Sequence, residues 1–288
     1  MTALIRQHTE SAPPGLLAEW LGERGIAYNL HRTYADAPMP DPRDYAFIVT
    51  LGSDRNPRDT HDPAVVAELS LLERAIEQDV PVLGLCFGGQ ALAAALGAPV
   101  EPAPVPELGW TAIETDEPEL VPPGPWLEWH YERFSTPPGA TEIARTGGAT
   151  QAFRHGRHLG VQFHPEATVE IVAGWAASDR ERIAALGHTD ASPLIAASPE
   201  KREAARAAAF ALFDGFLERA TGSVQEQSVR PERPWTEPGA ARVPKGIRTY
   251  FRGFGWRSGE VSTAVVRLCR LLGRARNPAA AAAAARRG

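Results

Sequence analysis

Cysteine and long apolar runs are both scarce in this sequence. Only two cysteines occur, Cys86 and Cys269, and they stand in different sequence contexts. This count excludes a disulfide framework and favours a reducing compartment. No stretch approaches the roughly 20 apolar residues that cross a bilayer, and the N-terminus lacks the basic and apolar segments of a signal peptide. We therefore expect a cytoplasmic protein that is neither secreted nor membrane-spanning.

Motifs that bind nucleotides are missing as well. The sequence holds no GxxxxGKS or GxxxxGKT and no strand-coupled GxGxxG, so no segment predicts a cradle for ATP or a dinucleotide. His155 and His158 flank a glycine, but no cysteine or carboxylate completes a metal-binding pattern with them. We expect no cofactor and no bound metal.

Charges of both signs are present, but they are distributed unevenly. The whole chain carries a formal net charge of −5, while residues 222–288 hold 13 Lys or Arg against 4 Asp or Glu. Residues 1–221 therefore carry −14, and an acidic domain is a poor surface for nucleic acid. Proline and glycine punctuate the chain after Thr221. We predict an acidic folded domain at 1–221, followed by a Pro/Gly-rich linker and basic tail at 222–288.

Within the tail, residues 261–275 predict a basic amphipathic helix. Its apolar positions recur at intervals of three and four residues and are Val261, Ala264, Val265, Leu268, Leu271 and Leu272. A helix of about 15 residues is marginal alone in water, so the apolar stripe needs a surface. We favour a protein surface, either a partner or the acidic domain itself, over peripheral contact with an anionic membrane face. Cys269 is expected to pack rather than to react.

Runs of β type alternate with amphipathic helical stretches in the first 100 residues. Strands are predicted at residues 3–6, 26–31, 46–51 and 80–85. Helices are predicted at residues 15–25, at 64–78 and from just after Cys86 to Gly97. This alternation is typical of an α/β fold with a doubly wound, mostly parallel sheet flanked by helices.

The second half of the acidic domain is harder to read. Between Val100 and Gly160 the density of proline and glycine predicts short strands, apart from TAIET at 111–115 and ATEIART at 140–146. A hairpin that turns at Gly156 leads into the segment HPE. Two helices, at 169–186 and 199–219, are expected to close the domain.

The segment PVLGLCFGGQALAAALG, residues 81–97, joins a buried strand to a helix at Cys86. Small residues on either side of a nucleophile permit a strained strand-to-helix turn that projects its side chain above the sheet. The helix N-terminus favours the thiolate, which is the reactive form of cysteine. A buried cysteine that merely packs is the alternative, and the flanking Gly84 and Gly88 weigh against it.

A cysteine nucleophile needs a base, and the base needs an orienting group. The segment GVQFHPE, residues 160–166, supplies both at the end of an apolar strand. Glu166 stands two residues after His164, so its carboxylate can accept from one imidazole nitrogen while the other nitrogen faces the thiol. The segment HPE alone is a weak indication of a catalytic base. Together with the strand-to-helix turn at Cys86, it is a strong one.

GLCFGGQ at residues 84–90 and GVQFHPE at residues 160–166 together resemble the class I (triad) glutamine amidotransferase family. The chain is similar to its stand-alone members, which are like the glutaminase domain of GMP synthase, over about residues 3–217. The resemblance implies hydrolysis of the glutamine side-chain amide through a γ-glutamyl thioester on Cys86. His164 and Glu166 would complete the triad.

The resemblance also implies an oxyanion hole and a substrate pocket. Gly52 and Ser53 stand where the family has the Gly-Gly-Pro turn that helps to form the hole, and the backbone amide of Phe87 would be its second donor. If only glycine tolerates the required conformation, Ser53 weakens the hole. The positions that match substrate-contacting segments are Gln90, Gly109, Trp110, His130 and Tyr131. The last two belong to WHYERF, which resembles a family loop carrying Trp-His-x-Asp.

The resemblance predicts a glutaminase that supplies ammonia to an unidentified acceptor, with a separate synthetase subunit as the expected partner. A γ-glutamyl peptidase or hydrolase with the same triad is one alternative, in which the leaving amine is larger than ammonia. A binding or regulatory protein with an idle site is the other. The intact Cys86, His164 and Glu166 favour an enzyme.

Overall fold

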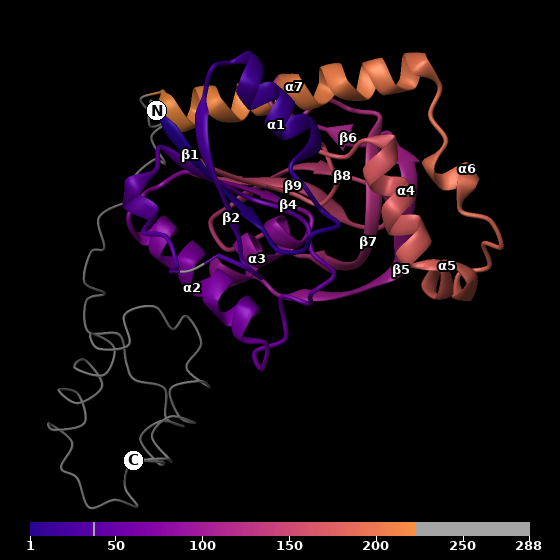
Figure 1. The fold of residues 1–288 in the computed structure, drawn as a ribbon, viewed down its shortest axis with the longest axis horizontal. Coiled ribbons are helices and arrows are strands. Elements are labelled where there is room, and N and C mark those ends of the chain that lie inside the picture. The colour runs from indigo at the N-terminus through magenta and orange to yellow at the C-terminus, as the bar shows by residue number, and fades with distance from the viewer. Residues whose placement is uncertain (37, 223–288) are drawn as a thin grey trace, which may run out of the picture. The chain divides into compact units, whose positions relative to one another are not determined.

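A computed structural model describes residues 1–36 and 38–222. Its main sheet has eight strands: β1 (Thr2–Gln7), β2 (Ala27–Arg32), β3 (Phe47–Thr50), β4 (Val82–Leu85), β6 (Glu114–Thr115), β8 (Thr141–Arg145), β9 (Thr150–His155) and β10 (His158–Val161). Their spatial order is β2-β1-β3-β4-β10-β9-β8-β6 (Figure 1). The first five strands in this order are parallel, and the remaining pairs are antiparallel. The predicted α/β fold with a mostly parallel sheet is confirmed.

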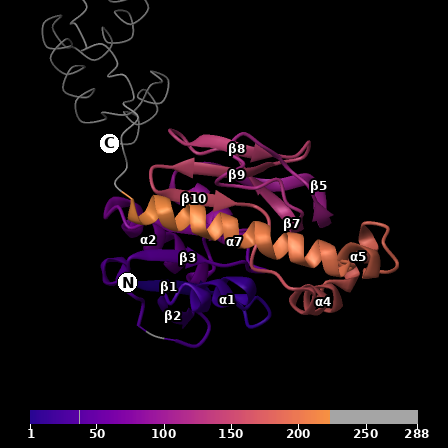
Figure 2. The ribbon, with the colours of Figure 1, turned by 90° about the horizontal axis from the view of Figure 1, so that it is seen from above.

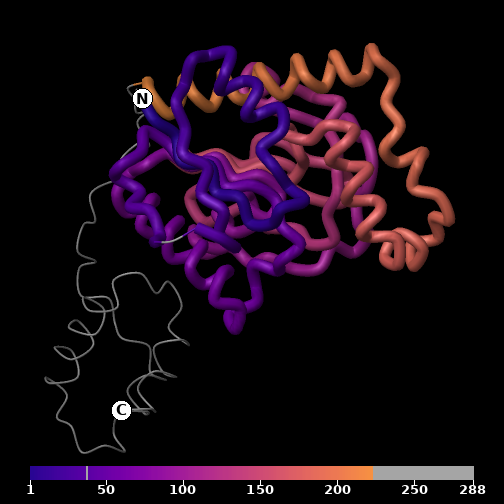
Figure 3. Tube along the Cα trace, in the orientation of Figure 1, coloured from indigo at the N-terminus to yellow at the C-terminus, as the bar shows by residue number. Residues whose placement is uncertain are grey.

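Helices cover both faces of this sheet. They are α1 (Gly15–Glu23), α2 (Pro63–Glu77), α3 (Phe87–Ala95), α4 (Val169–Ser178), α5 (Arg180–Ala185), α6 (Ser192–Ile195) and α7 (Pro199–Thr221), with a 3₁₀ turn η1 (Pro42–Asp44). On one face α1 packs against α7, with the rings of Trp20 and Phe213 5.4 Å apart. On the other face α2 packs against α3. Figure 2 shows α7 crossing the sheet, and Figure 3 shows its C-terminal end near the N-terminus along the long axis.

The buried strands explain why the sequence pattern is readable here. All four residues of β3 and all four of β4 are buried, as parallel strands covered on both faces require. The start of α2 is encoded locally as well. Asp62 accepts a hydrogen bond from the amide of Ala64, and Pro63 occupies the first helical position. Parallel pairing of β4 with β3 and with β10 places the carboxyl ends of these three strands side by side.

The prediction of short strands between Val100 and Gly160 agrees with β6, β8 and β9, which have two to six residues, and is wrong for two other strands. β5 (Val100–Thr111) and β7 (Trp126–Phe134) are long and pair with each other as a separate two-stranded antiparallel sheet. The register is interrupted between Pro102 and Glu107, so the prolines there fall where ladder hydrogen bonds are missing. WHYERF, expected as a loop, is the second half of β7.

The helix predicted at residues 169–186 is two helices. The chain breaks at Asp179, with φ −102° and ψ 17°, between α4 and α5. The Asp179 carboxylate accepts from the Tyr131 hydroxyl at 2.5 Å and from the Trp129 indole at 3.3 Å. A tertiary contact with β7 therefore accompanies the break.

The end of α7 at Thr221 coincides with the predicted domain boundary, and the division of the whole chain stays a prediction. The tail prediction at 261–275 and Cys269 lie outside the described residues. In the part of the chain that the structure describes, no helix combines the length and apolar character needed to cross a bilayer.

Candidate functional site

Cys86 occupies a strained turn between β4 and α3. Its φ of 50° and ψ of −107° are rare for a residue with a side chain, and such strain commonly marks functional sites. Glycine is required two residues later, because a Cβ on Gly88 would lie 2.0 Å from the carbonyl oxygen of Thr50. The turn thus holds the thiol at the carboxyl end of the sheet, as the sequence predicted.

His164 and Glu166 lie beside this thiol, just after β10. The Nδ1–H of His164 donates to Oε1 of Glu166 at 2.8 Å, and both residues are buried. Burial opposes a charged ring, but interactions with Cys86 and with the Glu166 carboxylate raise the pKa of His164 well above 6.5. The indole of Trp175, in α4, packs on the same ring at a centroid distance of 4.6 Å. The ring is held by a carboxylate on one edge and faces sulfur on the other.

Backbone hydrogen bonds fix this pair from two distant segments. The amide of His164 donates to the carbonyl of Leu127 in β7 at 2.9 Å, and the amide of Leu16 at the start of α1 donates to the carbonyl of Glu166 at 2.9 Å. The HPE segment is therefore tied to the second sheet on one side and to the first helix on the other.

The residues expected in an oxyanion hole surround the same point. A Cβ on Gly52 would lie 2.9 Å from Cε1 of His164, so Gly52 directly abuts the ring. Phe87 is the first residue of α3, which has no side-chain cap, and the first amides of a helix have no acceptor within it. In the described part of the chain, the non-glycine residues with positive φ are Asp79 and Cys86, so Ser53 does not have a positive φ. Its replacement of glycine therefore needs no left-handed backbone.

A cavity of about 470 Å³ opens over the thiol. Of the expected site residues, it is lined by Ser53, Cys86, Gln90, His130 and Tyr131. The side-chain amide of Gln90 donates to the backbone carbonyl of Glu132 at 3.1 Å. This hydrogen bond joins α3 to the cavity wall in β7.

Two expected substrate-binding residues lie elsewhere. The indole of Trp110 donates to the carbonyl of Ile195 in α6 at 3.3 Å, and Gly109 approaches Leu194. Neither residue lines the cavity over Cys86 in the described part of the chain. Both positions pack β5 against α6.

A comparison with known proteins decides the family. The protein-family model described as "Glutamine amidotransferase class-I" matches residues 16–171, more than half of the chain. This chain belongs to the class-I glutamine amidotransferase family. It is 30% identical over 196 residues to the glutamine amidotransferase-like protein YfeJ of Salmonella typhimurium, a match that covers 63% of this chain and 81% of the relative.

Two further matches place this amidotransferase-family chain among its relatives. It is 34% identical over 134 residues to the glutamine-hydrolyzing GMP synthase of Aeropyrum pernix, covering 43% of the chain but only 25% of the synthase. The crystal structure of a glutamine amido transferase from Methylobacillus flagellatus is 27% identical and superimposes with a TM-score of 0.66. That match covers 76% of this chain and 94% of the other.

Sequence reasoning missed residues that surround the thiol of this amidotransferase-family chain. The amide of Gln162 lies 3.8 Å from Sγ of Cys86. Its signal was the spacing of two from His164, which places both side chains on one side of an extended segment. Trp175 had no such signal, because an aromatic residue in a helix is more often core. Contact with the His164 ring depends on how α4 packs.

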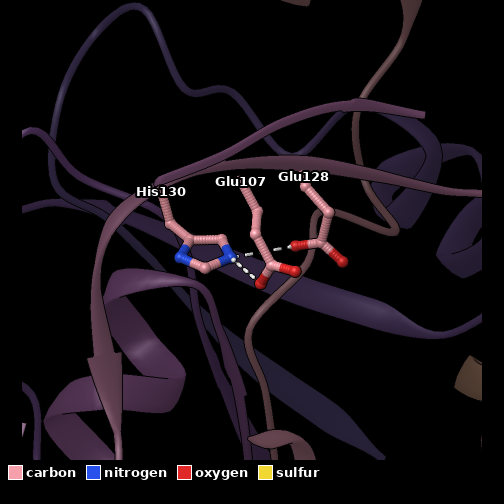
Figure 4. Close-up of side chains that lie close together, drawn as sticks. All are labelled: Glu107, Glu128 and His130. Carbon is pink, nitrogen blue, oxygen red and sulfur yellow. Dashed lines mark ion pairs between the residues drawn. The ribbon is translucent and has the colours of Figure 1, made fainter. Parts of the chain in front are cut away.

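Three ionisable side chains of β5 and β7, of which only His130 lines the cavity, were not connected by the sequence analysis either. Glu107, Glu128 and His130 converge beneath the two-stranded sheet (Figure 4). Burial raises the pKa of Glu128. Burial opposes charge on His130 as well, but the adjacent carboxylates of Glu107 and Glu128 raise the pKa of His130 to about 10.

Proposed function

We propose that this chain hydrolyses the side-chain amide of glutamine through a γ-glutamyl thioester on Cys86, with His164 and Glu166 as the other members of a catalytic triad. The proposal rests on one arrangement. Cys86, in a strained turn, faces the imidazole of His164, and Nδ1 of that ring lies 2.8 Å from Oε1 of the buried Glu166. Membership of the glutamine amidotransferase family supports the same substrate.

In the first step His164 accepts the thiol proton of Cys86, and the sulfur attacks the amide carbon of glutamine. Glu166 stabilises the imidazolium that forms and keeps the ring in orientation. The negative charge that develops on the amide oxygen is held by backbone amides at Phe87 and at the Gly52–Ser53 turn. One such donor typically contributes on the order of 100-fold to 1000-fold in turnover.

In the second step the imidazolium of His164 gives its proton to the departing nitrogen, and ammonia leaves. The remaining thioester carbon is attacked by water, from which His164 removes a proton. Collapse of that intermediate breaks the C–S bond and releases glutamate. The thiol of Cys86 and the neutral ring of His164 are regenerated, so no co-reactant besides water is consumed.

Release of ammonia from glutamine by the purified full-length chain tests the proposal. Turnover that disappears in Cys86→Ala is the expected result. A panel of γ-glutamyl dipeptides separates the two enzymatic readings, because a γ-glutamyl peptidase would release the second amino acid faster than it releases ammonia from glutamine. Absence of turnover on every substrate would favour the idle-site alternative.

The acceptor of the ammonia belongs to a second proposal. The Aeropyrum relative is a glutamine-hydrolyzing GMP synthase, and this chain matches a quarter of its length. We infer that a separate synthetase polypeptide activates the acceptor. Stimulation of glutaminase turnover by a co-purified ATP-dependent ligase would support a separate synthetase. The reducing conditions expected of the cytoplasm would keep the thiol of Cys86 reduced.

A further inference from the structure

Three side chains meet on one face of the β5–β7 sheet (Figure 4). Glu107 on β5 pairs directly with His130 on β7, and Gly109 pairs with Glu128. Residues two apart on a strand point to the same face, and directly paired residues share a face. The register therefore brings Glu107, Glu128 and His130 together, and their donor atoms all lie within 4.8 Å of one another.

The orientation of the imidazole is fixed from its far side. Nδ1–H of His130 donates to the backbone carbonyl of Glu132 at 2.9 Å. Nε2 then points towards Oε2 of Glu107 at 3.1 Å and Oε2 of Glu128 at 3.3 Å. Histidines that bind metals commonly donate their other ring nitrogen to a backbone carbonyl in this way.

These groups lie at ion-pair distances from one another, but the contacts of Nε2 with the two carboxylates lack hydrogen-bond geometry. In the described part of the chain, both carboxylate oxygens of Glu128 and Nε2 of His130 have no hydrogen bond of acceptable geometry. The side chain of Glu128 is 0% exposed and that of His130 is 1% exposed. A buried carboxylate without a hydrogen bond is costly, so an unpaired oxygen aimed at the same point as Nε2 calls for a further partner there.

The separations fit a shared cation. Two ligands that each lie about 2.1 Å from one ion, at roughly 90 to 109° from each other, are about 3.0 to 3.4 Å apart. The distances from Nε2 to the two carboxylates, 3.1 and 3.3 Å, fall in this interval. A divalent ion would also balance the two carboxylate charges.

We propose that Glu107, Glu128 and His130 bind a zinc ion. One imidazole and two carboxylates form a donor set that zinc accepts, with a fourth position left for water. The buried amide of Gln151 donates to Oε2 of Glu107 at 2.8 Å, which orients that carboxylate as outer partners of metal ligands do. The expectation of no metal missed this set because its members come from two strands whose register the sequence does not reveal.

The ion would stiffen the cavity wall and take no part in amide cleavage. His130 lines the cavity, and the carbonyl of its neighbour Trp129 lies 4.0 Å from Sγ of Cys86. Under this proposal His130 is a metal ligand instead of a substrate contact. The zinc site does not depend on the proposed glutaminase activity.

Zinc titration of the full-length chain tests the site. The background is Cys86→Ala, so that the catalytic thiol cannot bind the metal itself. After removal of metals with a chelator, calorimetry with zinc chloride gives stoichiometry and affinity, and the visible absorption of added cobalt(II) reports ligand geometry. The variants are Glu128→Gln and Glu107→Gln, and the control is Glu101→Gln, which alters an exposed carboxylate on β5.

We expect one zinc ion per chain, an affinity at least tenfold lower in both cluster variants, and no change in the control. The cobalt spectrum should also be lost in the cluster variants. Failure of the background chain to bind zinc would overturn the proposal, as would cluster variants that bind like the control. If Glu128→Gln does not fold, Glu107→Gln decides, because its side chain is 19% exposed and its neutral form keeps the Gln151 contact.

Discussion

Gly52→Ala should damage turnover while leaving the fold intact. The added Cβ would lie 2.9 Å from Cε1 of His164, whereas ordinary carbon contacts begin at about 3.5 Å. The ring must therefore move by roughly half an ångström, although Glu166 and Trp175 restrain it. Because a misplacement of about 1 Å can cost on the order of 100-fold in rate, we expect kcat/KM for glutamine to fall about tenfold or somewhat more.

The assay is steady-state ammonia release, with thermal unfolding followed in parallel. Gly22→Ala in α1 is the matched control, since its Cβ would meet nothing within 4 Å. This control should keep full activity and gain about 0.5 to 1 kcal/mol of stability from the loss of a helical glycine. Unchanged kcat/KM in a folded Gly52→Ala variant would refute the reasoning that this contact positions His164.

Three other predictions concern the reactivity of Cys86, the role of Glu166 and the titration of His8. A thiol-alkylating glutamine analogue should label Cys86 and spare Cys269, as peptide mapping would show; equal labelling would count against a selectively activated nucleophile. Glu166→Gln should lower kcat by about 10³- to 10⁴-fold with little change in KM, and an unaltered kcat would make Glu166 structural. Burial lowers the pKa of His8 to about 4 despite the attraction of Glu68, so the unfolded chain, with a histidine pKa of about 6.5, takes up this proton first. The contribution of His8 is complete above pH 6.5 and decreases by up to about 3 kcal/mol towards pH 4. Urea unfolding should show a loss of stability that is smaller by about this amount in His8→Gln, which retains the contribution of His158, whose pKa burial also lowers to about 4.

The parts of the site that the sequence predicted are those encoded within a few residues. The turn at Cys86 needs Gly88 because its backbone touches β3, so the chemistry and the local geometry share one motif. His164 and Glu166 are likewise two residues apart, which lets their contact be inferred without a tertiary structure. The parallel strands β3 and β4 were readable because burial on both faces makes them continuously apolar.

The parts that the sequence did not predict depend on the register between strands or on helix packing. β5 was obscured by prolines that fall in a gap of its ladder, and the break between α4 and α5 accompanies hydrogen bonds from Tyr131 and Trp129 to Asp179. The meeting of Glu107 with His130 requires the pairing of β5 with β7. Neither local propensity nor hydrophobic period carries that information.

The division of labour between the two sheets has a consequence for how such an enzyme can change. Cys86, His164 and Glu166 follow strands of the main sheet, whereas much of the cavity wall, including Trp129 and Tyr131, comes from the β5–β7 ribbon. Selection can therefore change the cavity-facing side chains of β5 and β7 while the strands that carry Cys86, His164 and Glu166 stay as they are.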